Sequence, residues 1–232
     1  MPETDFETCE KILKKTSQEM VDIIYDTLDI VDKVLRNAKI NYTVICGTML
    51  GSYRHGGQIP WDDDGDIAIE MKDVERLVAL KETFASEGYI LDEEPFFGYR
   101  VYDPRRTMIR ISDGVPIPFV DIFLICTNDN KYEVLEGALE LFPGEALPYG
   151  CFQRLVDVPF GHLTLRGMND EDAQRHLDEN FGSDWNKVAW RIFDHVTGDE
   201  LPKVCVKLDR PELRRPALHS KHCMFVESSV VK

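Results

Sequence analysis

The chain has 232 residues and a formal net charge of −15, from 27 lysines and arginines against 42 aspartates and glutamates. Hydrophobic residues make up 43% and charged residues 30%, an ordinary globular composition that excludes disordered, collagen-like and fibrous classes. A surface this acidic repels phosphate backbones and anionic membranes, so we expect no nucleic-acid partner, and any phosphate chemistry here requires a cation.

The cysteines predict a reduced, intracellular protein. They are scattered without a CxxC pattern or a short Cys/His spacing, which argues against a zinc site or a disulfide framework. The first ten residues, MPETDFETCE, have no signal-peptide pattern, and the longest apolar run is too short to span a bilayer. We therefore expect a cytoplasmic protein without an integral membrane segment. The six cysteines are Cys9, Cys46, Cys126, Cys151, Cys205 and Cys223.

The first half of the chain alternates helical and strand patterns. Apolar residues at three- and four-residue steps predict a long amphipathic helix over 12–38. A β-branched run at 42–46 predicts a buried strand that ends at a glycine turn, followed by a short helical segment over 49–55. A second strand is expected over 66–70 and a helix over 72–87, with Asp73 as its cap.

Strand patterns dominate the middle of the chain, and helical and hairpin patterns follow them. Weak strands are expected near 89–91, 99–102 and 108–111, and a strong strand is expected over 119–125. The later part of the chain predicts a helix over 132–141 and a hairpin over 155–165. A further helix is expected to begin after its cap, Asn169, and to end at Gly182. The order predicts an α+β fold with a mixed sheet flanked by helices and a smaller helical C-terminal part. We expect one domain over 1–200, with the core sheet at about 40–130 and the helical and hairpin part at about 131–200, and then a basic tail over 201–232.

Four acids, Asp62, Asp63, Asp64 and Asp66, crowd into five positions before an apolar strand. A solvated acidic loop is one interpretation. However, the two-residue period of a strand puts Asp64 and Asp66 on one face, opposite the isoleucines at 67 and 69. Two carboxylates on one face can converge on Mg²⁺ or Mn²⁺. The EF-hand pattern fails, because it requires a glycine and a glutamate where this chain has isoleucine and aspartate.

A third acid, Asp121, interrupts the most apolar strand of the chain, where an ionised carboxylate is costly unless it is paired or binds metal. One interpretation is an ion pair with Arg110. The other is a metal site that Asp121 completes together with Asp64 and Asp66, able to hold one or two Mg²⁺ ions that bridge substrate phosphates.

Candidate phosphate contacts lie between the first strand and the acids. Gly47 and Thr48 form a turn whose backbone N–H groups can cradle phosphate. Arg54 and His55 follow one helical turn later as further candidates, and Arg54 could instead form a salt bridge to Asp62 or Asp63. If Arg110 does not pair with Asp121, it is another candidate phosphate ligand.

The segment 47–67, GTMLGSYRHGGQIPWDDDGDI, closely resembles the signature of the LicD/fukutin-related family within the nucleotidyltransferase superfamily. The match continues at FVDIF over 119–123 and more loosely at FGSDW over 181–185, and covers roughly residues 20 to 190. Gly65 departs from the family, which usually has an aliphatic residue there, and could permit a bulge or a close backbone approach to a ligand. Trp61 is interpreted as a packing residue.

The resemblance implies a nucleotidyltransferase-like fold and a Mg²⁺- or Mn²⁺-dependent phosphotransferase. Such an enzyme moves phosphocholine or an alditol phosphate from a CDP-linked donor to a glycan or related hydroxyl acceptor and releases CMP. It implies Asp64 and Asp66 as metal ligands, Asp62 as a nearby acid or outer-shell ligand, and Asp121 as a third ligand or the general base. A nucleotidyltransferase that transfers the nucleotide itself and a degenerate, non-catalytic binding domain are the alternatives.

Overall fold

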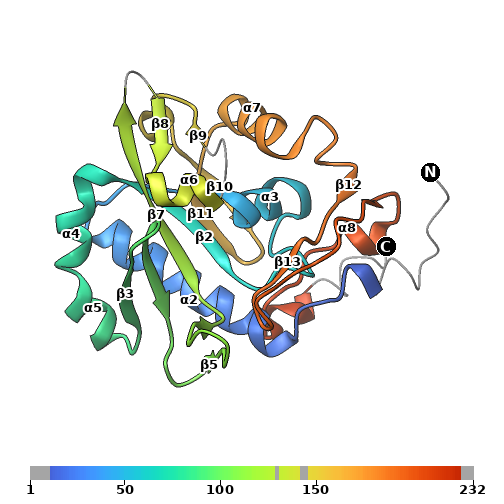
Figure 1. Cartoon of the computed structure of the whole chain (residues 1–232), viewed down its shortest axis with the longest axis horizontal. Helices are drawn as coiled ribbons and strands as arrows, with labels where there is room; N and C mark the ends of the chain where they lie inside the picture. The colour runs from blue at the N-terminus through green and yellow to red at the C-terminus, as the bar shows by residue number, and fades with distance from the viewer. Residues whose placement is uncertain (1–10, 129–130, 142–145, 226–232) are drawn as a thin grey trace.

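The computed structural model describes residues 11–128, 131–141 and 146–225 (Figure 1). Its centre is a seven-stranded sheet with the order β1-β2-β7-β4-β3, extended by β8 on β7 and by β9 on β8. β2 and β7 run parallel, and the other pairs are antiparallel, so the predicted mixed sheet is confirmed. The strands are β1 (Tyr42–Val44), β2 (Gly65–Glu70), β3 (Ile90–Glu94), β4 (Gly98–Tyr102), β7 (Val120–Asn128), β8 (Lys131–Val134) and β9 (Ala146–Leu147).

The long helix α2 (Gln18–Asn37) packs its apolar stripe against this sheet. It begins six residues later than the pattern predicts, because the Ser17 hydroxyl accepts the N–H of Met20 and caps it there. A Cβ on Gly65 would lie 3.4 Å from Leu28 of α2 and 3.2 Å from Val120 of β7. The glycine therefore lets α2 approach the sheet, and the bulge that Gly65 could permit does not form, because β2 stays in continuous register with β7.

Two segments differ from the sequence expectation. The helix expected over 72–87 is a 3₁₀ turn (Met71–Asp73) and two short helices, α4 (Val74–Val78) and α5 (Lys81–Ser86), and the side chain of Asp73 binds Arg76 instead of capping. The segment expected as a helix over 132–141 begins as strand β8, and only α6 (Glu136–Leu141) is helical. Tyr132 and Val134 alternate into the core, which is the period of a strand.

The C-terminal part is built as much from strand pairs as from helices. The expected hairpin is confirmed as β10 (Val156–Phe160) and β11 (Leu163–Gly167). The expected helix is α7 (Asp170–Phe181), and the Asn169 side chain accepts the N–H groups of Glu171 and Asp172. Two further strand pairs lie in this part, β12 (Val188–Ala189) with β15 (Val206–Lys207) and β13 (Phe193–Asp194) with β14 (Asp199–Glu200). The helix α8 is Pro211–Arg214, and 3₁₀ turns lie at Cys151–Gln153 and Ser220–Phe225. In the middle of the chain, β5 (Met108–Ile109) pairs with β6 (Pro116–Ile117).

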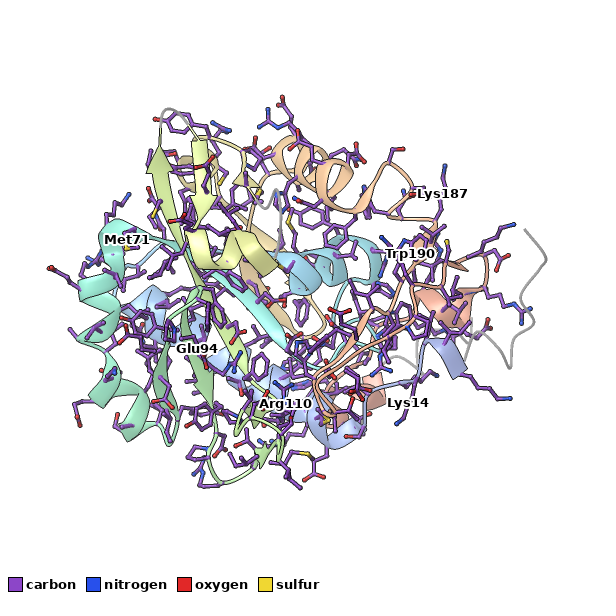
Figure 2. All side chains as sticks on the ribbon, in the orientation of Figure 1. Lys14, Met71, Glu94, Arg110, Lys187 and Trp190 are labelled. Atoms are coloured by element: carbon purple, nitrogen blue, oxygen red, sulfur yellow. The ribbon has the colours of Figure 1, made fainter. Side chains whose placement is uncertain are left out.

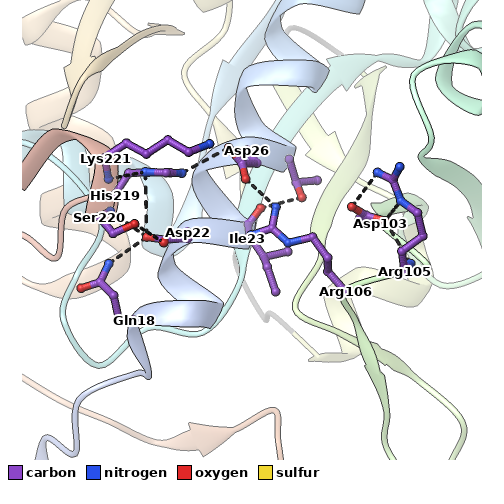
Figure 3. A network of polar contacts seen from close by, with 11 residues as sticks. Gln18, Asp22, Ile23, Asp26, Asp103, Arg105, Arg106, His219, Ser220 and Lys221 are labelled. Carbon is purple, nitrogen blue, oxygen red and sulfur yellow. Dashed lines mark hydrogen bonds and ion pairs between the residues drawn. The ribbon is translucent and has the colours of Figure 1, made fainter.

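Residues 201–225, the described part of the segment that the sequence sets apart as a basic tail, pack on α2 and α3 (Cys46–His55). The Tyr25 hydroxyl donates to the Ala217 carbonyl at 2.9 Å, and the Ser220 N–H donates to Asp22 at 2.8 Å. Figure 3 shows the contact between Ser220 and Asp22 and, beside it, His219, whose Nε2 lies 3.3 Å from Asp26 of α2. None of the helices in the described residues is long and apolar enough to cross a membrane.

We expect deletion of 201–232 to lower the melting temperature by more than about 10 °C. The deletion removes the buried apolar side chains Val206, Leu208 and Leu213 from the described part of this segment. Burial of each contributes about 1.5–3 kcal/mol, and each kcal/mol corresponds to about 2–4 °C in a chain of this size. Thermal melts measure the effect. Lys207→Gln with Arg215→Gln is the matched control, because it removes positive charge but no packing and should leave the melting temperature unchanged. A truncated chain that melts with the parent would contradict this packing.

Candidate active site

Three acids lie on one face of the parallel strands β2 and β7. Asp66 is directly opposite Asp121 in the register, and Asp64, two residues before Asp66, shares its side. Since Gly65 faces Leu28, these acids project from the face opposite α2. All three side chains are buried. The hydroxyl of Thr48, in the first turn of α3, accepts the N–H of Asp66 at 2.8 Å and ties the helix to the strand.

The interpretation of Asp121 as one half of an ion pair with an arginine is confirmed, but the arginine is Arg100 on β4 and not Arg110. Arg100 Nε lies 2.7 Å from Asp121 Oδ1, and Nη2 lies 2.9 Å from Oδ2. Its guanidinium lies 3.7 Å from the ring centroid of Phe119. Arg110, beyond the short strand β5, donates instead to Asp113 and to the His195 carbonyl, each at 2.7 Å. Figure 2 labels Arg110 in the lower part of the view, where β5 lies.

The surroundings of Asp121 raise the pKa of its carboxyl group. Burial raises the pKa of Asp121 to about 7, against the lowering effect of the Arg100 hydrogen bonds, and the charge of Asp64 adds to the rise. Both Asp121 oxygens accept from Arg100, and each retains a lone pair. Asp121 is therefore oriented by Arg100 and still able to bind a cation.

His195, which follows β13, lies against the acids, and the sequence analysis did not identify it as a site residue. Its Nδ1 lies 2.6 Å from Asp63 Oδ1, and its Nε2 lies 3.3 Å from Asp64 Oδ2. Burial lowers its pKa, but the neighbouring charge of Asp64 and the hydrogen bond to Asp63 outweigh burial and raise the pKa to about 9. No local motif could reveal this contact, because His195 and Asp63 are 132 positions apart.

Asp62 and Gly47 meet at the start of α3, which begins at Cys46 and so contains both residues of the expected Gly-Thr turn. A Cβ on Gly47 would lie 2.5 Å from Asp62 Oδ2, so only glycine fits. Asp62 Oδ2 is buried without a hydrogen-bond partner among the described residues. Burial, followed by the charges of Asp64 and Asp63, raises the pKa of Asp62 well above its usual value.

The two candidates at the end of α3 have other partners. Arg54 Nη1 donates to the carbonyls of Trp185 and Val188, each at 3.0 Å, and the alternative salt bridge to Asp62 or Asp63 is not among its described contacts. His55 is buried, with Nε2 3.2 Å from the Leu213 carbonyl, and burial followed by the charge of Arg54 lowers its pKa to about 3. A neutral, buried imidazole is not available to phosphate, so the expected role of His55 does not fit the structure.

A cavity of about 450 Å³ adjoins the acids. Its walls come from α3, the acidic loop, the end of α7 and residues 188–203. Trp61, Trp185 and Trp190, the three tryptophans of the chain, all line it. Figure 2 labels Trp190 on the side of the molecule where β12 and α8 lie. Gly47, Arg54, Asp62, Asp63 and His195 also line this cavity, which links the candidate residues of α3 to the acidic cluster.

The donor groups present fit a divalent cation. Asp63, Asp64 and His195 offer ligand atoms that lie within 4.8 Å of one another, and His195, whose pKa is raised to about 9, would have to release a proton to act as a ligand. Asp66 and Asp121 add carboxylates on the same face. Carboxylate oxygens suit Mg²⁺ and Mn²⁺, and an imidazole nitrogen is compatible with Mn²⁺. Buried carboxylates that would otherwise repel one another are a further reason for a cation here.

Comparison with known proteins gives the family. The model described as "LicD/FKTN/FKRP, nucleotidyltransferase domain" matches residues 39–170. The Haemophilus influenzae lipopolysaccharide cholinephosphotransferase LicD is 31% identical over 53% of this chain and 49% of its own length. The Homo sapiens ribitol 5-phosphate transferase FKRP is 38% identical over 64% of this chain but only 29% of its own. This chain thus spans about half or less of those two relatives.

Two further comparisons extend over more of the chain. An uncharacterized Rickettsia prowazekii protein, RP689, is 35% identical over 84% of this chain and 68% of its own length. The lincosamide antibiotic adenylyltransferase LnuA covers 71% of this chain and 97% of its own, with 11% identity and a TM-score of 0.41, too low a likeness to carry an argument. The family match includes both β2 and β7 and the acids they carry, so the chain belongs to the LicD/FKTN/FKRP nucleotidyltransferase-domain family.

Proposed function

We propose that the protein is a metal-dependent phosphotransferase that moves a phosphorylated small alcohol from a CDP-linked donor to a glycan or related hydroxyl acceptor and releases CMP. The observation that carries the proposal is that Asp66 and Asp121 lie opposite each other on β2 and β7, and that Asp62 and Asp63, close to Asp66 in the chain, line a cavity. The names of two relatives, a cholinephosphotransferase and a ribitol 5-phosphate transferase, support the reaction class.

In this proposal Asp64, Asp66 and Asp121 hold Mg²⁺ or Mn²⁺, and Asp62 is an outer acid. When bound, the cation would stabilise the charge of the transferred phosphoryl group. Arg100 fixes the plane of the Asp121 carboxylate through two hydrogen bonds. Thr48 fixes the backbone of Asp66, and the first turn of α3 at Gly47 presents N–H groups to a donor phosphate.

The test is CMP release from CDP-choline and from CDP-ribitol, with Mn²⁺ and with EDTA. We expect CMP with at least one donor, only when metal is present. Glu82→Gln, which removes an exposed acid of α5, is the matched control and should keep parental activity. Pyrophosphate release from a nucleoside triphosphate would instead indicate transfer of the nucleotide itself. Mn²⁺ binding without either product would indicate a non-catalytic binding domain.

A further inference from the structure

The imidazole ring of His195 is held in place from several sides. Its Nδ1 lies 2.6 Å from Asp63 Oδ1, and the backbone N–H of His195 donates to Asp63 Oδ2 at 3.2 Å. The ring makes T-shaped contacts with Phe119, at 5.5 Å between centroids, and with Phe193, at 4.9 Å. Arg110 Nη1 donates to the His195 carbonyl at 2.7 Å and anchors the backbone. The imidazole therefore has one fixed orientation.

This orientation assigns a role to each ring nitrogen. A carboxylate accepts hydrogen bonds and cannot donate them, so Nδ1 is the nitrogen that donates to Asp63. Nε2 then faces the other acid and lies 3.3 Å from Asp64 Oδ2. Two neighbouring ligands of one cation, each about 2.1 Å from it, lie roughly 3 Å apart. Nε2 and Oδ2 are therefore spaced as two ligands of a single cation.

The contact between His195 and Asp63 has the form that metal-binding histidines show in general. In such sites the nitrogen that does not bind the metal almost always donates to a carboxylate, a backbone carbonyl or water. That hydrogen bond fixes the tautomer and raises the basicity of the nitrogen that binds. The alternative is a protonated imidazole that neutralises the two acids and binds no metal.

His195 is also accessible to an ion. Its side chain is 27% exposed, and it lines the cavity beside the acids. Imidazole binds a metal only when the binding nitrogen is unprotonated, so Nε2 releases its proton to water as it becomes a ligand. The residue follows the region 39–170 that matches the family, so the family match does not assign it a role.

We infer that His195 Nε2 is a direct ligand of the cation that Asp64 binds, that Asp63 orients this imidazole, and that the site prefers Mn²⁺ to Mg²⁺. Imidazole nitrogen suits transition-metal ions, whereas Mg²⁺ is bound mainly through oxygen. The inference rests on the proposed function in one respect, which is the presence of a divalent cation at Asp64.

Pulsed electron paramagnetic resonance of the Mn²⁺-loaded protein tests the ligand directly and needs no turnover. An imidazole nitrogen bound to Mn²⁺ modulates the electron spin echo, and oxygen ligands do not. We expect nitrogen modulation from the parent and none from His195→Asn, whose amide N–H can still donate to Asp63 but which has no ring nitrogen to bind the ion. His162→Asn is the matched control, because His162 is exposed and is not part of the cavity wall, and its echo should equal that of the parent.

The preference between the two metals is the second readout. Mn²⁺ binding is measured from the resonance of the free ion in solution, and Mg²⁺ binding from competition with Mn²⁺. The parent should bind Mn²⁺ about tenfold or more tightly than Mg²⁺, and His195→Gln should lower this preference about tenfold. The glutamine amide oxygen reaches the region of Nε2 and is a ligand that Mg²⁺ accepts. This second variant keeps the experiment decisive if His195→Asn does not fold.

Three outcomes would overturn the inference: Mn²⁺ bound to the parent without nitrogen modulation, modulation that persists in His195→Asn, or no binding of Mn²⁺ to the parent. The two proposals fail separately. Nitrogen modulation without CMP release from either donor would support the ligand assignment and contradict the proposed function. CMP release with Mn²⁺ but without nitrogen modulation would support the function and contradict the ligand assignment.

Discussion

The Asp64→Asn variant is expected to lose about 1,000-fold or more in CMP release while keeping its stability in metal-free buffer. A bound cation contributes several kcal/mol of charge stabilisation in such reactions, and each 1.4 kcal/mol corresponds to a tenfold change in rate. The variant keeps an oxygen that can accept from His195 Nε2. It also removes one of several buried negative charges that repel one another. The melting temperature with EDTA should therefore equal or exceed that of the parent.

The readouts are CMP release with Mn²⁺ and thermal melts with and without metal. Mn²⁺ should raise the melting temperature of the parent but not that of Asp64→Asn, because only a ligand bound by the folded state stabilises it. Glu82→Gln again serves as the control with parental behaviour. A variant that melts more than about 5 °C below the parent in EDTA, or that keeps its activity, would contradict the assignment of Asp64 as a metal ligand.

The Arg100→Met variant is expected to be the most destabilising single change at the site. Arg100 and Asp121 are both buried, so removing the arginine leaves a carboxylate without its cation. Breaking a buried ion pair in this way costs about 3–5 kcal/mol, which corresponds to a fall of about 10 °C in a chain of this size. Thermal melts at neutral pH measure it.

A second pair of variants separates lost charge from lost packing. Arg100→Lys keeps a cation but not the two parallel hydrogen bonds, so its melting temperature should lie between those of the parent and Arg100→Met. The double variant Arg100→Met with Asp121→Leu removes both charges and should recover most of the loss. If the double variant melts as low as Arg100→Met, the cost is one of packing and the ion pair has no special role.

The acids of the site could be predicted from the sequence because their signals are local. The alternation of acidic and apolar residues from Asp64 onward predicts one strand, and the apolar run around Asp121 predicts another. The hairpin over 155–165 and the helix cap at Asn169 are equally local features, and both are confirmed. Residues within a few positions of one another carry enough information for such features.

The partners of those acids could not be predicted, because they depend on which strands become neighbours. Arg110 was considered for Asp121 by its place in the chain, but β4 lies beside β7 and brings Arg100 opposite Asp121. His195 arrives from a loop 132 positions beyond Asp63. Tyr132 lies in strand β8 because β8 pairs with the edge of β7. This tertiary pairing outweighs the local sequence pattern, which predicts a helix.

The parallel pairing of β2 with β7 has a consequence for how the protein folds. Two parallel neighbouring strands cannot be joined by a tight turn. The connection from β2 to β7 therefore contains all the elements from α4 to β6, and this long segment separates Asp66 from Asp121 in the chain. Contacts between residues so distant in the chain form slowly, since a long loop has to close first. We therefore expect the acidic face, and with it the proposed metal site, to form late in folding.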